Sequence, residues 1–208
     1  MPPLITELDH AQLTSPEQVL KYFFGYDSFR PGQQSIIEAV LQNQDALAIM
    51  PTGGGKSLCY QLPALLKSGL TIVISPLIAL MQDQVEALQD NGIGATFLNS
   101  TVSGAEVRRR SQQILQGKIK LLYVAPERIL TEAFLDFLDQ VAVQIGISTL
   151  AIDEAHCVSE WGMISVQNIG SSSNCGSAIP PCPYWPSLLQ PPPEFGKTSC
   201  SSSAYSSR

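Results

Sequence analysis

The sequence is short of charge, and most of the charge that it has is negative. Only 14% of the 208 residues are charged, and the formal net charge is −6. Such a chain is not an obvious binder of nucleic acid through bulk charge, although a local basic strip can override the net charge. A hydrophobic fraction of 44% with so little charge suits a globular core and not a disordered polymer. At this length we expect one domain with a tail, or one and a half domains.

Membrane-spanning runs, targeting segments and patterned cysteines are missing as well. No apolar run is long enough to span a bilayer, and no basic-then-apolar leader follows Met1, so we expect a cytoplasmic protein without a membrane partner. The five cysteines have neither metal-ligand nor disulfide spacing. Cys59 and Cys157 lie in apolar segments, where we expect buried thiols.

A glycine-rich motif follows an apolar segment. Residues 46–50 read ALAIM, residues 51–57 read PTGGGKS, and residues 58–62 continue as LCYQL. We interpret these as a buried strand, a phosphate-binding loop and the first turn of a helix, which is the context that the motif requires. Glycines let backbone N–H groups turn toward a phosphate, and the helix N-terminus adds partial positive charge. The motif's usual first glycine is Met50 here, and an ordinary glycine-rich turn between a strand and a helix is the alternative.

The loop supplies the candidate nucleotide-binding residues. Lys56 is predicted to reach the β- and γ-phosphates of a nucleotide, and the Ser57 hydroxyl is predicted to bind Mg²⁺. The loop residues that we expect to hold the nucleotide are Thr52, Gly53, Gly54, Gly55, Lys56 and Ser57.

Segments fit for short strands alternate with helical segments along the rest of the chain. The predicted strands are 70–74, 95–98, 119–124 and 148–152, and the predicted helices are 15–23, one ending near Asn43, 78–88, 103–115 with a capping box at Ser103 and Glu106, and 133–141. This alternation predicts the α/β class, with a parallel sheet covered by helices on both faces. Ligands of such sheets bind beyond the carboxyl ends of the strands.

Two carboxylates directly follow the last predicted strand. Asp153 is placed to bind Mg²⁺, and Glu154 to orient or deprotonate an attacking water. Because the phosphate loop also lies at a strand end, the two motifs can converge. A solvated turn or a helix N-cap is the alternative, and His156 is more simply a structural histidine. The predicted reaction is Mg²⁺-dependent nucleotide hydrolysis with Lys56, Asp153 and Glu154 as catalytic residues.

Three motifs together resemble the superfamily 2 helicases, and specifically the RecQ family of DNA helicases. They are PTGGGKS at 51–57, DEAH at 153–156 and FRPGQ at 29–33, supported by SPLIALM at 75–81, LNST at 98–101, APER at 125–128 and CVSEWG at 157–162. The resemblance is continuous from about residue 18 to 162. It implies a RecA-like P-loop NTPase fold, ATP and Mg²⁺ as cofactors, and 3′→5′ DNA unwinding in recombination and repair.

The resemblance also implies how base and DNA are bound. Tyr26 and Arg30 would stack on adenine, and Gln33 would hydrogen-bond with its edge. The alternative is that Tyr26 and Phe29 are simply core aromatics, and for Phe29 we favour this alternative. The loops at 75–77, 99–101 and 126–128 would touch the backbone of one DNA strand. The basic run Arg108, Arg109 and Arg110 is expected to be a solvated helix face and not a DNA clamp.

After Gly162 the composition changes. Residues 163–208 are rich in serine and proline and nearly uncharged, which predicts a disordered tail. A one-base shift of the reading frame lets residues 163–170 spell HDFRPEYR, the continuation expected from the family, and a later segment spells a further helicase motif. We therefore interpret 1–162 as an incomplete N-terminal RecA-like domain and 163–208 as an out-of-frame tail.

Three functions stay open on the sequence. The chain is a RecQ-type helicase by descent, without the parts needed for unwinding; or it is an ATP-binding and weakly DNA-binding fragment without turnover; or it is an unstable, non-functional product. An ATPase that is not a helicase is disfavoured by RPGQ at 30–33 and by Trp161-Gly162. The oligomeric state is not predicted.

Overall fold

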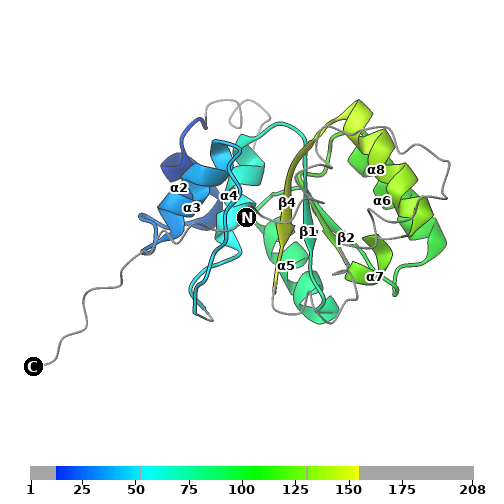
Figure 1. Cartoon of the computed structure of the whole chain (residues 1–208), viewed down its shortest axis with the longest axis horizontal. Coiled ribbons are helices and arrows are strands. Elements are labelled where there is room, and N and C mark those ends of the chain that lie inside the picture. The colour runs from blue at the N-terminus through cyan, green and yellow to red at the C-terminus, as the bar shows by residue number, and fades with distance from the viewer. Residues whose placement is uncertain (1–12, 52, 130, 155–208) are drawn as a thin grey trace, which may run out of the picture. The chain divides into compact units, whose positions relative to one another are not determined.

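The computed structural model of the chain describes residues 13–51, 53–129 and 131–154. Within them lies one sheet whose strand order is β2-β3-β1-β4, with every neighbouring pair parallel (Figure 1). The strands are β1 (Leu70–Ile74), β2 (Ala95–Leu98), β3 (Leu121–Val124) and β4 (Ile147–Ile152). The predicted α/β class is confirmed, and each of the four strands predicted downstream of the loop is present.

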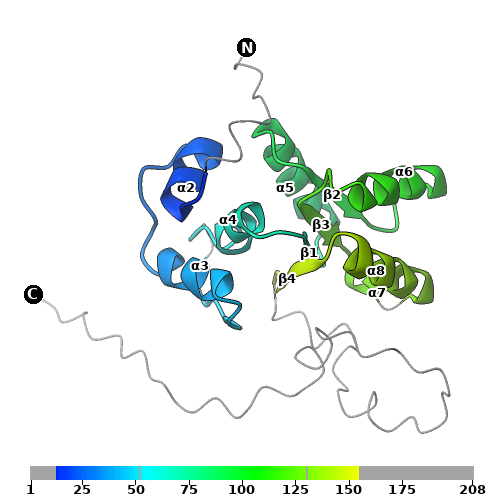
Figure 2. The same ribbon diagram turned by 90° about the horizontal axis from the view of Figure 1, so that it is seen from above.

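Helices cover both faces of this sheet. The helices of the described residues are α2 (Pro16–Phe24), α3 (Gln33–Leu41), α4 (Leu58–Leu66), α5 (Ile78–Asp90), α6 (Gly104–Leu115), the short α7 (Pro126–Ile129) and α8 (Glu132–Gln144). Seen from above, α4 and α5 lie on one side of the strands and α6 and α8 on the other (Figure 2). Helices α2 and α3 pack on α4, away from the sheet. No helix among the described residues is long and apolar enough to cross a membrane.

The core is built around the middle of the sheet. All five residues of β1 and all four of β3 are buried, as expected for central strands of a parallel sheet. Tyr123 is the largest fully buried side chain, and its hydroxyl accepts a hydrogen bond from Gln61 Nε2 at 3.0 Å. The predicted burial of Cys59 is confirmed, and Phe29 is half-buried and packs against the core cluster, as expected of a core aromatic.

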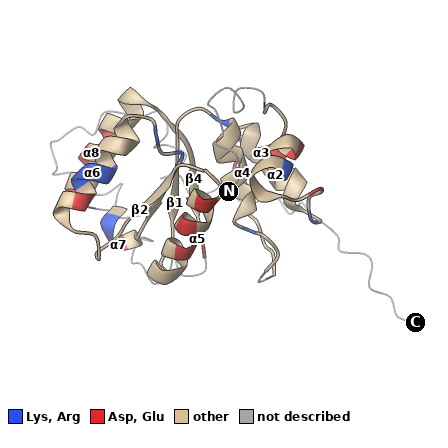
Figure 3. Cartoon of the chain, turned by 180° about the vertical axis from the view of Figure 1, so that it is seen from behind, with Lys and Arg blue, Asp and Glu red and all other residues tan. Residues whose placement is uncertain are grey.

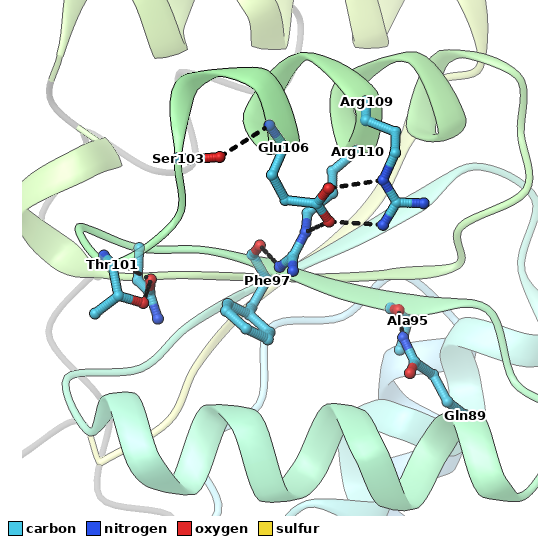
Figure 4. A network of polar contacts seen from close by, with 9 residues as sticks. Gln89, Ala95, Phe97, Thr101, Ser103, Glu106, Arg109 and Arg110 are labelled. Carbon is cyan, nitrogen blue, oxygen red and sulfur yellow. Dashed lines mark hydrogen bonds and ion pairs between the residues drawn. The ribbon is translucent and has the colours of Figure 1, made fainter.

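Local signals set the helix ends. At α2, Ser15 accepts from the Gln18 backbone N–H while the Gln18 side chain accepts from the Ser15 N–H, so a full capping box starts the helix. At α6, Ser103 caps as predicted, but the return bond of the box is replaced. Glu106 instead accepts hydrogen bonds from Arg109 and Arg110 (Figure 4).

The basic run of α6 is only partly solvated. Arg109 is exposed, but Arg110 lies over the Phe97 ring with its guanidinium carbon 4.3 Å from the ring centroid, and it donates to the Phe97 carbonyl at 2.7 Å (Figure 4). The prediction of a solvated face is therefore wrong for Arg110, because a long side chain can lay its apolar stem on the sheet while its charged head finds partners.

The buried strand predicted at residues 46–50 is also wrong. These residues form no strand, and Leu47 and Ile49 expose 67% and 89% of their surface. An apolar segment becomes a buried strand only where a neighbouring strand satisfies its backbone and helices cover its faces. Among the described residues no strand pairs with the outer edge of β4, where Ile152 is 45% exposed. Residues 46–50 therefore lie outside the sheet, without a paired neighbour.

Candidate functional site

The glycine-rich loop lies directly before α4. Its backbone turns at Gly53 (φ 76°) and Gly55 (φ 80°), in the left-handed region that glycine adopts without strain. Gly54 N–H donates to the Pro51 carbonyl at 2.9 Å. Ser57 starts the helix without using its side chain as a cap. The loop and helix predicted for the phosphate site are thus present, whereas the strand before them is not.

Gln33 holds this loop from the side. It is buried, with 2% of its surface exposed, although it belongs to the first turn of α3. Its Nε2 donates to the Gly55 carbonyl at 3.1 Å, and its Oε1 accepts from the Arg30 backbone N–H at 2.8 Å. A Cβ on Gly55 would meet Gln33 Nε2, so the close approach requires glycine.

Arg30 and Tyr26 lie on the segment between α2 and α3. Arg30 Nη1 donates to the Gly53 carbonyl, which gives the loop a second contact from this segment. Tyr26 is 54% exposed, so it is not the core aromatic that was the alternative reading. Two of the residues expected to bind the base, Arg30 and Gln33, therefore contact the loop expected to bind the phosphates.

The strand-end carboxylates meet the loop. Lys56 Nζ lies 3.8 Å from Glu154 Oε1, both side chains being about one quarter to one third exposed. Asp153 is only 8% exposed, and the charges of both Lys56 and Glu154 influence its pKa. The predicted convergence of the phosphate loop with the carboxylates is confirmed.

The environment of Asp153 disfavours its charged form. Burial is the largest cause and the adjacent Glu154 carboxylate the next, and together they raise its pKa. A hydrogen bond from the Glu154 backbone N–H to Asp153 Oδ1 (3.1 Å), a hydrogen bond with the Gln84 side chain and the charge of Lys56 act in the opposite direction. A cation that binds the carboxylate would relieve this unfavourable state.

Glu154 has an unusual backbone. Its φ of 55° lies in the left-handed region, which non-glycine residues seldom adopt. Strained backbone of this kind concentrates at functional sites, where the surrounding structure maintains it. Here it turns the chain sharply after β4 and brings the Glu154 carboxylate to Lys56.

A partly buried polar contact joins α4 to α5. Tyr60 Oη on α4 donates to Gln84 Oε1 on α5 at 2.9 Å. The Tyr60 and Tyr123 rings are 6.4 Å apart, edge to face. Burial raises the pKa of Tyr123 to about 12 and that of Tyr60 well above its usual value, so both stay protonated donors. The sequence reasoning missed Tyr60 and Gln84, because apolar periodicity assigns both only to helices.

The donor set suits Mg²⁺. A hydroxyl at Ser57 and a carboxylate at Asp153 are hard oxygen ligands, and Mg²⁺ in nucleotide sites is commonly held by one or two such groups together with phosphates and water. The described residues contain no group of three or more His, Cys, Asp or Glu suited to a metal ion. The site therefore fits Mg²⁺ brought in with a nucleotide better than a dedicated metal cage. Thr52, His156 and Cys157 lie outside the described residues.

Unsatisfied polar atoms gather at the carboxyl ends of three other strands. In the described part of the chain, the buried side-chain atoms without a hydrogen-bond partner are Ser75 Oγ, Asn99 Nδ2 and Arg128 Nε. They follow β1, β2 and β3 respectively. Buried polar groups are nearly always paired, so these three are candidates for binding a ligand or water. They belong to the three loops predicted to contact DNA.

Charge is unevenly spread over the helices. Acidic residues mark α5, where Asp83, Glu86 and Asp90 are exposed, and basic residues mark α6 (Figure 3). The exposed face of α5 is thus unsuited to a polyanion.

Known proteins have sequences similar to that of this chain. The sequence profile described as "DEAD/DEAH box helicase" matches residues 30–174. This chain belongs to that family. The match includes the phosphate loop and the strand-end carboxylates, and it runs past Gly162, where we expected the resemblance to stop.

Relatives narrow the family further. The chain is 53% identical over 144 residues to the ATP-dependent DNA helicase RecQ of Haemophilus influenzae, covering 69% of this chain and 23% of the relative. It is 48% identical over 147 residues to the protein of the same name from Bacillus subtilis, covering 70% and 24%. The resemblance to the RecQ family is confirmed, and the chain spans about a quarter of the length of these relatives.

Proposed function

We propose that this chain binds Mg²⁺·ATP as the nucleotide-binding part of a RecQ-type ATP-dependent DNA helicase. The observation that carries the proposal is the approach of Lys56 to Glu154, 3.8 Å apart and beside the buried Asp153. It joins a phosphate-loop cation to strand-end carboxylates, the arrangement that phosphoryl transfer uses.

Each group then has a distinct task. Lys56 holds the β- and γ-phosphates, and Ser57 with Asp153 holds Mg²⁺. When bound, Mg²⁺ neutralises charge on the phosphate oxygens. Glu154 orients the attacking water and accepts its proton. Catalysis of this kind rests on positioning and on charge stabilisation, which fixed side chains supply.

The base is recognised by the segment before α3. Tyr26 and Arg30 stack on adenine, and Gln33 bonds its edge. The exposure of Tyr26 supports stacking, and the contacts of Arg30 and Gln33 with loop carbonyls link base recognition to the phosphate site. Because Gln33 already uses both ends of its amide, reading the base requires it to exchange a loop contact for the adenine edge.

DNA is the proposed macromolecular partner, bound through the backbone of one strand. The loops at 75–77, 99–101 and 126–128 make these contacts, supported by the unpartnered atoms of Ser75, Asn99 and Arg128. In the complete family architecture ATP hydrolysis would drive 3′→5′ unwinding in recombination and repair, in the cytoplasm. The chain spans about a quarter of the length of these relatives.

A second function, nucleotide and weak DNA binding without turnover, is favoured by one observation. The segment at 46–50 that precedes the phosphate loop is exposed and outside the sheet, so the loop is less firmly held than a catalytic loop needs.

Thermal unfolding with and without Mg²⁺·ATP tests the main proposal. Binding to the folded state raises the melting temperature, and Lys56→Ala removes most of the shift. ATP hydrolysis stimulated by single-stranded DNA, and absent in Lys56→Ala, then separates turnover from binding alone. No shift with the wild-type chain excludes nucleotide binding, and clear strand displacement contradicts the expected lack of unwinding.

A further inference from the structure

Strand β2 forms the end of the sheet opposite to β4. The carbonyls of Gly94 and Leu98 accept hydrogen bonds from the backbone of β3 and of the residue that follows it. Carbonyls of alternate residues point to the same side of a strand, so those of Ala95 and Phe97 point away from β3, along the outer edge of β2. Within the part of the chain that the structure describes, no strand pairs with this edge.

Side chains occupy both of these outward carbonyls. Gln89 Nε2, in the last turn of α5, donates to the Ala95 carbonyl at 2.8 Å, and Arg110 Nη1 on α6 donates to the Phe97 carbonyl at 2.7 Å (Figure 4). Helices α5 and α6 lie on opposite sides of the strands, so the edge is closed from both faces of the sheet (Figure 2). We call Gln89 and Arg110 the edge-capping pair.

Arg110 is held firmly in this position. Its guanidinium carbon lies 4.3 Å from the centroid of the Phe97 ring, and its Nε donates to Glu106 Oε1 at 2.7 Å. The Arg110 side chain is 17% exposed, whereas that of Arg109, which pairs with the same carboxylate, is 61% exposed. A strand that paired with β2 would have to displace this stacked guanidinium from the Phe97 carbonyl, to which a charged donor binds more strongly than a neutral one.

The two ends of the sheet therefore differ. No strand among the described residues pairs with the outer edge of β4, and Ile152 is 45% exposed there. Two copies that joined β4 to β4 would use the same edge of each and form a closed dimer. Copies that joined β4 of one to β2 of the next would continue the parallel sheet and leave a free edge at each end, so they would form an open-ended polymer.

We propose that the edge-capping pair keeps the outer edge of β2 from binding the β4 edge of a second copy of this chain. It thereby limits self-association to β4 edges and excludes head-to-tail growth. If Gln89 and Arg110 only satisfied two carbonyls, their loss would lower the stability of the chain and leave its state of association unchanged. The inference involves no nucleotide and is independent of the proposed function.

The test is sedimentation velocity of the full chain over a range of concentrations. Gln89→Met combined with Arg110→Met retains long side chains and removes both hydrogen bonds to the edge. We expect the wild type to reach at most the mass of two copies. The double variant should exceed the wild-type mass roughly twofold or more and keep rising with concentration, because head-to-tail pairing has no closed end point. Adding Ile152→Lys, which places a charge at the β4 edge, should suppress this growth.

The matched control is Arg109→Met combined with Gln112→Met, the same two changes at exposed residues of α6 outside the edge-capping pair. It should leave the mass at the wild-type value. Equal growth in the control, no growth in the edge variant, or growth that Ile152→Lys does not suppress overturns the inference. If the double variant fails to unfold cooperatively on heating, Gln89→Met alone, a change at an exposed residue, decides by the same three criteria.

Discussion

Lys56 Nζ lies 3.8 Å from Glu154 Oε1, so the loop lysine is already paired with the carboxylate proposed to handle water. An incoming phosphate competes with Glu154 for this cation. The pair is partly exposed, and such pairs contribute little stability. Lys56 can therefore exchange its contact with Glu154 for a contact with a phosphate at little cost in stability.

Glu154→Gln should separate binding from turnover. Removal of the competing charge frees Lys56, and we expect a roughly twofold to fivefold tighter affinity for Mg²⁺·ATP, the range expected from the loss of a partly exposed ion pair. Any DNA-stimulated hydrolysis should fall about 10²–10⁴-fold, because the proton acceptor is lost. Calorimetric binding and phosphate release measure the two effects. Weaker binding would show that Glu154 supports Lys56 instead of competing with it.

Asp153→Asn should stabilise the chain without nucleotide. The raised pKa means that the folded chain holds the Asp153 proton more tightly than the unfolded chain, whose ordinary value is 3.8. The stability contributed by this carboxyl group is greatest below pH 3.8. It falls as the pH rises through the pKa that the group has in the folded chain. At neutral pH the substitution should raise the free energy of unfolding by about 0.5–2 kcal/mol, while Mg²⁺-dependent stabilisation disappears. Urea unfolding across pH measures this, and an unchanged pH profile in the variant would contradict it.

Gly55→Ala should destabilise the loop more than Gly53→Ala. Both residues have positive φ, so each alanine costs roughly 1–2 kcal/mol of backbone strain. Only at Gly55 would the new Cβ meet another residue, Gln33, whereas at Gly53 it meets nothing within 4 Å. Gly53→Ala is thus the matched control in urea unfolding. Combining Gly55→Ala with Gln33→Ala should remove the excess, and equal costs at both glycines would argue against the Gln33 contact.

Glu106 should titrate far below an ordinary glutamate. Hydrogen bonds from Arg109 and Arg110 lower its pKa from 4.5 to about 2. The stability that it adds to α6 is present above pH 4.5 and is lost as the pH falls through about 2. Carboxyl NMR titration gives the midpoint directly, and Glu106→Gln should remove this part of the acid dependence. Glu132→Gln, in the first turn of α8, serves as the control; an ordinary midpoint for Glu106 would contradict the arginine contacts.

The outer edge of β4, with which no strand of the described residues pairs, should promote self-association. Unpaired strand edges pair readily with other strands, and Ile152 adds exposed apolar surface there. Ile152→Lys should reduce the concentration-dependent increase in mass seen by sedimentation velocity. Val143→Lys changes an equally apolar residue of α8, 87% exposed but away from the strand, and should have little effect. If both substitutions reduced association equally, exposed apolar surface in general, and not the edge of β4, would be its cause.

Most elements could be predicted because their signals are local. The β-branched run at 70–74 and the Ser103 cap of α6 each determine structure within a few residues, and both are present. The convergence of Lys56 with Glu154 was also predictable, since ligands of parallel sheets gather at the carboxyl ends of strands.

The failures have a common physical cause. Residues 46–50 are apolar enough for a buried strand, but burial depends on neighbours that no local pattern encodes. Arg110 over Phe97, Gln33 under Gly55 and Gln84 beside Tyr60 are likewise tertiary contacts of long side chains. Periodicity assigns such residues to an element but not to a partner.

The exposed segment at 46–50 has a consequence for affinity itself. The phosphate loop is fixed by α4 on one side and by contacts from Gln33 and Arg30. Residues 46–50, which precede the loop, are not part of the sheet. ATP must then supply the order that a neighbouring strand would otherwise provide, and this ordering entropy is subtracted from its binding free energy. Under the proposed function, the affinity of this chain for ATP therefore depends in part on how well residues 46–50 are held in place.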